Sequence, residues 1–158
     1  MRPMLHFAYG SNMDRAVMRK HAPAATALGG AVLHNHRFLI TSDGYASVEP
    51  ARAGTVYGVL WRLTPRDRIM LDRWESTASG QYRAEMMYVQ AAGGCRPALV
   101  YVALPRCRGV PKAGYMDLVV AAARSWNLPQ PYIAALERWL PAQPRTSGTR
   151  NLKEFGWT

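Results

Sequence analysis

The sequence predicts a single α+β domain in which a small mixed β-sheet or β-barrel is flanked by helices. Its 158 residues are the length of one domain, and 49% of them are apolar, which is enough to bury a core. Runs typical of strands outnumber runs typical of helices, and they follow the order β-α-β-β-β-α-β-β-α-α. That order is an α+β pattern in which most strands belong to one small sheet or barrel.

A strand, a turn and a helix are expected near the N-terminus. Residues 5–9 form a short apolar run that ends at Gly10, as a strand does where it enters a turn. Ser11 and Asp14 stand three positions apart in a capping-box pattern. We therefore expect a short helix over residues 13–20 with Ser11 as its cap.

Three strands are expected in the next part of the chain. Residues 32–40 are rich in strand-forming types, residues 45–49 form a shorter candidate, and residues 55–63 carry the strongest strand pattern. His34 and His36 fall on one face of the first of these strands. Two His on a strand face are half of a metal site, but no third or fourth ligand accompanies them, which favours a structural role. We therefore expect no bound metal.

A capped helix is expected after the third of these strands. Thr64 suits the cap, Pro65 suits the first helical position and Asp67 completes a capping box. This helix should end near Glu75, where a loop of small residues begins. A lone Glu at a helix end is most often a solvated surface residue, so its position alone does not indicate catalysis.

The C-terminal part is expected to contain a hairpin, two helices and a polar tail. Gly93-Gly94 is a hairpin signal, and Pro141 stops the last helix. The expected elements are strands over residues 82–90 and 96–104, helices over 115–126 and 131–140, one domain over 1–142, and a C-terminal extension over 143–158.

The chain is strongly basic, with a formal net charge of +10. Such a balance can indicate a nucleic-acid or acidic-membrane partner. Seventeen of the twenty basic residues are Arg, and they are scattered, with no block of five like charges and no aromatic–basic RNA-binding pattern. This distribution favours a compositional origin of the charge and argues against nucleic acid as the main partner.

No feature of a membrane or secreted protein occurs in the sequence. It has no run of about 18 apolar residues, and residues 1–9 lack the core and cleavage site of a signal peptide. Cys95 and Cys107 form no CxxC pair, and two isolated Cys are usually reduced in the cytoplasm. We therefore expect a cytoplasmic protein.

The turn at residues 9–13, Tyr-Gly-Ser-Asn-Met, is the first candidate site. Gly10 lets the backbone bend and allows a ligand to approach closely. Unpaired N–H groups at the start of a helix can bind a carboxylate or phosphate. An ordinary strand–turn–helix connection explains the same pattern equally well, and the turn has neither a P-loop Lys nor a GxGxxG motif.

Taken together, the motifs resemble the gamma-glutamylcyclotransferase family. The family's opening motif, Tyr-Gly-Ser-Asn and an apolar residue, stands complete at residues 9–13. The family's acid follows a Leu-Asp helix and precedes a Tyr by seven positions. Here Leu71-Asp72 leads to Glu75, and Tyr82 lies seven residues further on. Over residues 5–140 the further matches are a V-x-G-V-x-W-like strand at 55–61, Tyr115, Leu128-Pro129 and Tyr132.

The resemblance implies an acyl transfer by intramolecular aminolysis, without metal or cofactor. The α-amine of a gamma-glutamyl amide attacks its own γ-carbonyl, which closes 5-oxoproline and releases an amine or amino acid. Glu75 would take a proton from the amine and return one to the leaving nitrogen. Trp74 could supply an apolar wall that raises the pKa of Glu75, whereas Arg73 and Arg83 could lower it if they point inward. The implied substrate-binding residues are Tyr9, Gly10, Ser11, Asn12, Met13, Tyr82, Tyr101 and Tyr115, with the main-chain N–H groups of residues 10–13 as the chief donors.

Two other functions stay open at this stage. The same residues could remove a gamma-glutamyl group from a different amine, an isopeptide or a carrier-bound product. The fold could also be a non-catalytic module that binds a small ligand or nucleic acid, although a binding module does not need an acid–base carboxylate. The expected partner is a small gamma-glutamyl substrate and not a membrane. The tail, with Phe155 and Trp157, could pack on the domain or mediate self-association as a homodimer.

Overall fold

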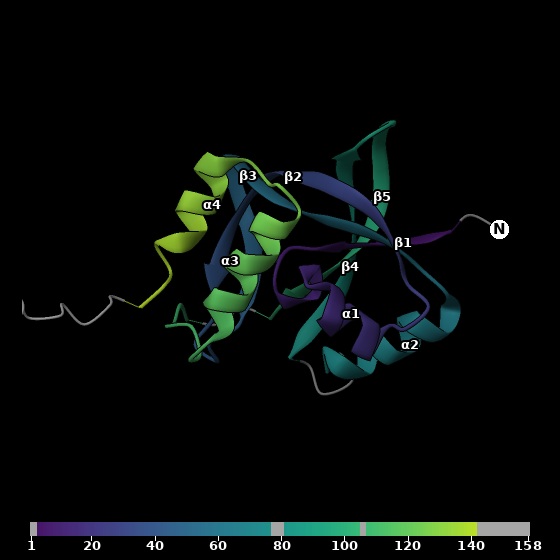
Figure 1. Cartoon of the computed structure of the whole chain (residues 1–158), viewed down its shortest axis with the longest axis horizontal. Helices are drawn as coiled ribbons and strands as arrows, with labels where there is room; N and C mark the ends of the chain where they lie inside the picture. Colours follow the sequence, from purple (N-terminus) through teal and green to yellow (C-terminus); the bar gives the residue numbers. More distant parts are fainter. Residues whose placement is uncertain (1–2, 77–80, 105–106, 142–158) are drawn as a thin grey trace, which may run out of the picture.

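The computed structural model describes residues 3–76, 81–104 and 107–141. Five strands form a closed barrel, with helices packed on its outside (Figure 1). The elements are β1 (Met4–Ala8), η1 (Ser11–Met13), α1 (Arg15–His21), β2 (Thr26–Ile40), β3 (Ala46–Leu63), α2 (Pro65–Trp74), β4 (Tyr82–Ala91), β5 (Gly94–Ala103), α3 (Tyr115–Ser125) and α4 (Gln130–Glu137).

The strands follow the order β1-β3-β2-β4-β5 around the barrel, so the expectation of a small mixed barrel with flanking helices is confirmed. Neighbouring strands are antiparallel except β1 and β5, which meet in parallel at His6 and Leu99. Because β1 and β5 are the first and last strands in the chain, their pairing closes the barrel and brings residues near the N-terminus beside the second half of the sequence. The candidate active site depends on this closure.

One long strand, β3, replaces the two shorter strands expected at residues 45–49 and 55–63. The chain stays paired with β2 through an irregularity opposite His34 and His36, and Asn35 and Ala53 adopt positive φ angles of 58° and 60° there. A Cβ on Gly54 would lie 2.4 Å from the carbonyl oxygen of His36, so only Gly fits this close approach. The break in the strand pattern therefore marks a bulge.

The first helix begins later than the sequence predicts. Residues Ser11–Met13 form a 3-10 turn, and α1 starts at Arg15 with Asp14 as its N-cap. The Asp14 carboxylate accepts a hydrogen bond from the Val17 N–H at 2.9 Å. The predicted capping role of Ser11 is wrong, because Asp14 is a better-placed cap for the helix that actually forms.

The cap predicted for the second helix is confirmed. The Thr64 hydroxyl accepts from the Asp67 N–H at 3.1 Å, and the Asp67 carboxylate accepts from the Thr64 N–H at 3.0 Å. Asp67 is buried and also accepts from the Ala24 N–H at 3.2 Å. This carboxylate therefore joins the start of α2 to the segment that precedes β2.

The hairpin and the two C-terminal helices also form where the sequence predicts them, although α4 ends at Glu137. Helices α1 and α2 pack together on one side of the barrel, and α3 packs against α4 and η1 (Figure 1). The indole N–H of Trp126 donates to the Met13 carbonyl at 2.7 Å and so ties the end of α3 to η1. The extension over residues 143–158 lies outside the described residues, and the domain boundary at 142 stays a prediction.

Buried apolar side chains from the strands and helices form one continuous core. The barrel contributes fully buried side chains such as Phe7, Val56 and Val100. The helices contribute Val119 from α3 and Ile133 from α4, whose side chains are at most 1% exposed. Burial of this kind is the main contribution to the stability of a domain of this size. None of the described helices is long and apolar enough to cross a membrane.

Candidate active site

A cavity of about 460 Å³ opens between the barrel and the ends of α1, α2 and α3. This volume lies within the range of small-molecule sites, which is roughly 300–1,000 Å³. The lining comes from β1 and η1, from one face of α1, from the C-terminal end of α2, from Tyr82 of β4 and Tyr101 of β5, and from Tyr115 of α3. Every residue expected at the site from the sequence lines this cavity, with the exception of Met13.

Glu75 is the only Asp or Glu among the described residues of the cavity wall. It follows the last residue of α2, and its N–H donates to the Leu71 carbonyl at 2.8 Å, which fixes the backbone at the helix end. Burial raises the pKa of Glu75 to about 7, and the hydrogen bond from Asn12 partly opposes this rise. A carboxyl group with this pKa can gain and lose a proton near neutral pH.

A hydrogen bond from Asn12 orients the Glu75 carboxylate. The side-chain Nδ2 of Asn12 donates to Glu75 Oε1 at 3.0 Å, and Asn12 itself is buried. The hydrogen bond joins η1 to the end of α2, so it both orients the carboxylate and stabilises its ionised form. Asn12 therefore acts on Glu75, whereas the sequence suggested only a contact with substrate.

The residues that flank Glu75 in sequence contribute less than expected. Trp74 is 51% exposed and stacks on His21, with 3.7 Å between ring centroids, so it lies at the rim of the cavity. Arg73 and Arg83 are exposed, and Arg83 pairs with Glu85. Neither Arg is among the causes of the shifted pKa of Glu75. Burial, and not a neighbouring charge, is therefore the main cause of the raised pKa of Glu75.

Three tyrosine hydroxyls of the cavity wall are bonded to other parts of the protein. Tyr9 donates to the carbonyl of Tyr101 at 2.5 Å, Tyr82 donates to the carbonyl of Ala46 at 3.0 Å, and Tyr101 donates to Asp72 Oδ1 at 2.7 Å. Burial raises the pKa of all three phenols, so they stay protonated at neutral pH. These tyrosines therefore connect strands and helices around the cavity, and their rings form its walls.

Tyr115 lies directly against the turn that carries the sequence motif. Its hydroxyl accepts from the Ala46 N–H at 3.3 Å and is also hydrogen-bonded to Ser11. Burial raises the pKa of Tyr115 to about 12, and these hydrogen bonds oppose the rise. A Cβ on Gly10 would stand 2.7 Å from the Tyr115 hydroxyl oxygen. A larger residue at position 10 would therefore force the turn or the Tyr115 side chain to shift.

The turn offers fewer free main-chain donors than the sequence suggested. The Met13 N–H donates to the Gly10 carbonyl at 3.1 Å, and Ser11 is bonded to Tyr115. The Met13 side chain is fully buried in the core. The expectation that Met13 holds substrate is wrong, because its N–H closes the 3-10 turn. Within the described part of the chain, the N–H groups of Gly10 and Asn12 have no protein acceptor.

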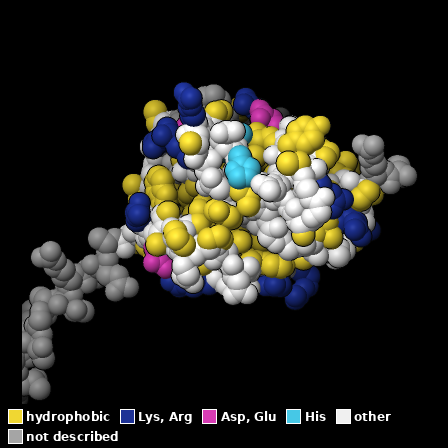
Figure 2. Space-filling view, turned by 90° about the horizontal axis from the view of Figure 1, so that it is seen from above, with side chains coloured by type: hydrophobic (Ala, Val, Ile, Leu, Met, Phe, Trp, Pro, Cys, Tyr) yellow, Lys and Arg dark blue, Asp and Glu magenta, His cyan; other side chains and the backbone are white. Residues whose placement is uncertain are grey.

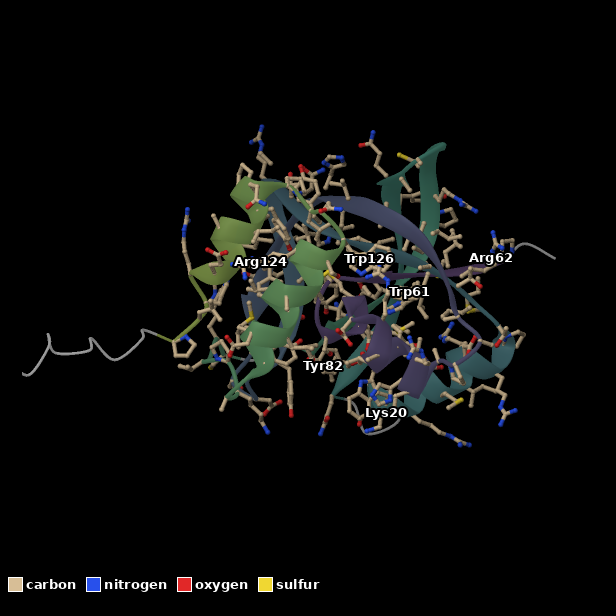
Figure 3. The ribbon with its side chains drawn as sticks, in the orientation of Figure 1. Lys20, Trp61, Arg62, Tyr82, Arg124 and Trp126 are labelled. Carbon is tan, nitrogen blue, oxygen red and sulfur yellow. The ribbon has the colours of Figure 1, made fainter. Side chains whose placement is uncertain are left out.

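Several residues of the cavity wall were not expected from the sequence, among them three from α1 and one from β1. Helix α1 contributes Val17, Lys20 and His21, which are spaced as i, i+3 and i+4 and so share one face. That spacing was the available signal, but it indicates a functional face only once the helix is known to border a cavity. Figure 3 shows Lys20 of α1 on the same side of the molecule as Tyr82. The residue from β1 is His6.

His6 is buried, and its Nδ1 lies 3.1 Å from the Leu99 carbonyl oxygen. A carbonyl only accepts, so Nδ1 carries the proton. Burial lowers the pKa of His6 to about 4, and the ring is therefore neutral at physiological pH. Its edge-to-face contact with Tyr101, at 5.4 Å between centroids, places it in the wall behind that tyrosine.

The two His that suggested half of a metal site do not converge. His34 Nε2 lies 2.8 Å from Gln90 Oε1, and His36 Nδ1 lies 2.9 Å from the His34 carbonyl oxygen. The bulge at Asn35 changes the direction of the strand between them. In the described part of the chain, no three His, Cys, Asp or Glu side chains are grouped as metal ligands would be. Cys95 and Cys107 are exposed free thiols.

Basic side chains are spread over the surface. On the face seen in Figure 2, Lys and Arg occur at several separate places around the molecule, with hydrophobic and uncharged surface between them. This picture agrees with the scattered positions of Arg in the sequence. The absence of a nucleic-acid partner stays a prediction.

Fold and site together define a small α+β barrel protein with one half-buried acid among the described residues of a tyrosine-walled cavity. The chain belongs to the AIG2-like family, whose model matches residues 55–136, just over half of its length. That match includes Glu75, Tyr82, Tyr101 and Tyr115, while the turn at residues 9–13 precedes it. No curated protein matches the chain significantly by sequence.

Solved structures extend the similarity to nearly the whole chain. A gamma-glutamyl cyclotransferase superposes with a TM-score of 0.83 at 21% identity and covers 98% of both chains. YkqA from Bacillus subtilis superposes with a TM-score of 0.76 at 26% identity, covering 91% of this chain and 56% of its own. A yeast gamma-glutamyl cyclotransferase specific to glutathione gives 0.60 at 10% identity, covering 88% of this chain and 96% of its own. The fold is therefore that of the gamma-glutamylcyclotransferases.

Proposed function

We propose that this protein is a gamma-glutamylcyclotransferase-type enzyme that converts a gamma-glutamyl group into 5-oxoproline and releases an amino acid or amine. The observation that carries the proposal is Glu75. It is the one carboxyl group among the described residues of the cavity wall, with a pKa raised to about 7 by burial and with its orientation held by Asn12. Perturbed carboxyl groups in cavities of this size are the usual mark of acid–base chemistry.

The reaction moves two protons from the attacking nitrogen to the leaving nitrogen, and one carboxyl group can relay both. Ionised Glu75 takes the first proton from the α-ammonium of the substrate, and the free amine then attacks the γ-carbonyl carbon. The C–N bond to the leaving group breaks as protonated Glu75 gives this proton to the departing nitrogen. The ring nitrogen then loses its second proton to Glu75, which passes it to the released amine. The products are 5-oxoproline and an ammonium ion, and Glu75 ends ionised, as it began.

The chain's other cavity residues would position the substrate and stabilise charge. The free N–H groups of Gly10 and Asn12 suit a carboxylate or the oxyanion that develops on the γ-carbonyl oxygen. The hydroxyls of Tyr82 and Tyr101 are bonded to protein groups, which leaves their rings to face the cavity. These rings would exclude water from the folded glutamyl chain. Holding the amine near the carbonyl is itself a large part of the rate enhancement in such cyclisations.

A panel of gamma-glutamyl dipeptides, gamma-glutamyl amines and a gamma-glutamyl isopeptide tests the proposal, with 5-oxoproline as the measured product. We expect turnover of at least one class, and a loss on the order of 100-fold or more for Glu75→Gln. Circular dichroism and a thermal melt must show that the variant is folded. Binding of these ligands without any 5-oxoproline would instead support a non-catalytic module.

A further inference from the structure

One face of α1 forms a part of the cavity wall that carries both apolar side chains and a positively charged one. Val17, Lys20 and His21 point toward the cavity, and the His21 ring stacks on Trp74 at 3.7 Å. The pKa of His21 is lowered by burial and by the nearby Lys20 ammonium, so the ring is neutral at physiological pH. This side of the cavity therefore consists of an apolar residue, an aromatic stack and one amine.

Lys20 is the only Lys or Arg among the described residues that line the cavity. It is exposed, and no acid of the described chain lies within ion-pair distance of it, Glu75 included. Lys20 is also absent from the causes of the shifted pKa of Glu75. The amine therefore provides an unneutralised positive charge at a part of the cavity separate from the acid.

The turn after β1 forms another part of the cavity wall. At Gly10 the backbone is so close to its neighbours that a Cβ would lie 2.7 Å from the Tyr115 oxygen and 3.3 Å from the Ala46 Cβ. This part of the wall carries the free N–H groups of the turn. On the proposed function, the compact glutamyl group belongs there with its γ-carbon beside Glu75, and the variable leaving group extends toward α1.

We propose that Lys20 determines substrate specificity by binding a carboxylate on the leaving group. This inference rests on the proposed function and makes it more specific. A leaving amino acid or peptide carries such a carboxylate, whereas a simple amine carries none and a polyamine would be repelled. The Val17 side chain and the aromatic stack would contact the apolar part of the same leaving group.

The test compares two substrates that differ only in this charge, gamma-glutamylalanine and gamma-glutamylalaninamide. The wild-type protein should prefer the free acid in kcat/KM by about 3- to 5-fold, as one partly solvated ion pair provides. Lys20→Gln should bring the ratio close to one by raising KM for the acid alone, and Lys20→Arg should retain the preference. The preference should also weaken as ionic strength rises. Arg19→Gln is the matched control, because Arg19 is exposed on the same helix and does not line the cavity.

Two outcomes of the kinetic comparison would overturn the proposal. If Lys20→Gln lowers kcat/KM equally for both substrates, Lys20 holds the glutamyl part, and if it changes neither, Lys20 is a bystander. Calorimetric titration of both ligands into the Glu75→Gln protein, with and without Lys20→Gln, measures the same preference without turnover. A protein that binds the acid more tightly through Lys20 but forms no 5-oxoproline would retain this inference and refute the proposed reaction. Equal binding of the two ligands would refute the inference.

Discussion

Asn12 and Glu75 are 63 positions apart in the chain, yet the Asn12 amide donates to the Glu75 carboxylate at 3.0 Å. One residue lies in the turn after the first strand, and the other follows the last residue of α2. Burial and this hydrogen bond have opposite effects on the pKa of Glu75, and burial is the larger. The two motifs that the sequence presents separately therefore form one acid–base unit.

The pH dependence of turnover should reveal this unit. Glu75 must be ionised to accept the first proton, so kcat/KM should rise with pH and inflect near pH 7. Asn12→Ala removes a donor that stabilises the carboxylate, so the inflection should move to higher pH. The measurement is the profile of kcat/KM from pH 5 to 9 for both proteins. An inflection that stays in place in a folded variant would mean that Asn12 does not tune Glu75.

Glu75→Gln should change stability in a pH-dependent way. The folded pKa of about 7 lies above the value of about 4.5 expected for the unfolded chain, so the native state binds more protons between these values. The wild-type protein therefore loses stability as pH rises through this window, and the Gln variant does not. The variant should gain on the order of 2 kcal/mol relative to wild type between pH 4 and pH 8. Urea denaturation of both proteins at pH 4 and pH 8 measures this gain. If the difference in unfolding free energy between variant and wild type is the same at both pH values, the pKa of Glu75 is not raised.

Gly10→Ala should reduce activity far more than a matched glycine substitution. The new Cβ would be 2.7 Å from the Tyr115 oxygen, so the turn or the tyrosine must move. We expect a loss of roughly 10-fold or more in kcat/KM, because small displacements of catalytic groups are costly. Gly30→Ala is the control, since its Cβ would meet nothing closer than 3.8 Å. Equal activities in the two variants would show that the close contact is not needed for function.

Tyr101→Phe should affect stability more than catalysis. The Tyr101 hydroxyl donates its proton to Asp72 at 2.7 Å, so this proton is not available to a ligand. Its removal should cost about 1 kcal/mol in the free energy of unfolding and change kcat/KM by less than about 3-fold. Tyr115→Phe provides the comparison, because its hydroxyl contacts the Gly10–Ser11 turn. A much larger catalytic loss in Tyr101→Phe than in Tyr115→Phe would assign the substrate contact to Tyr101.

Prolonged chelation should leave activity unchanged, because the proposed reaction needs only proton transfer and positioning. The measurement is 5-oxoproline formation after dialysis against a chelator, beside an untreated sample. Loss of activity with recovery on addition of zinc would bring His34 and His36 back into consideration as ligands.

Local patterns were enough for much of the secondary structure. Thr64, Pro65 and Asp67 act through hydrogen bonds within one helical turn, so the start of α2 could be predicted from adjacent residues. The Gly93-Gly94 hairpin is local in the same sense. The prediction for Ser11 was wrong because both Ser11 and Asp14, three positions apart, suit a helix cap, and only the folded turn decides between them. The sequence predicts two strands where β3 has a bulge at Ala53, because the pairing with β2 that holds the two parts together is a tertiary interaction.

By itself the sequence determined that the chain forms an α+β domain, and its resemblance to a known family singled out Glu75 and the turn at residues 9–13 as the candidate site. Tertiary structure alone decided that these two places meet, because β1 pairs with β3 and β5 while α2 ends beside the turn. It also assigned the tyrosine hydroxyls to the protein and brought Lys20 to the cavity. The physical reason is that burial, and with it the pKa of Glu75, depends on residues far apart in the chain, which no local pattern specifies.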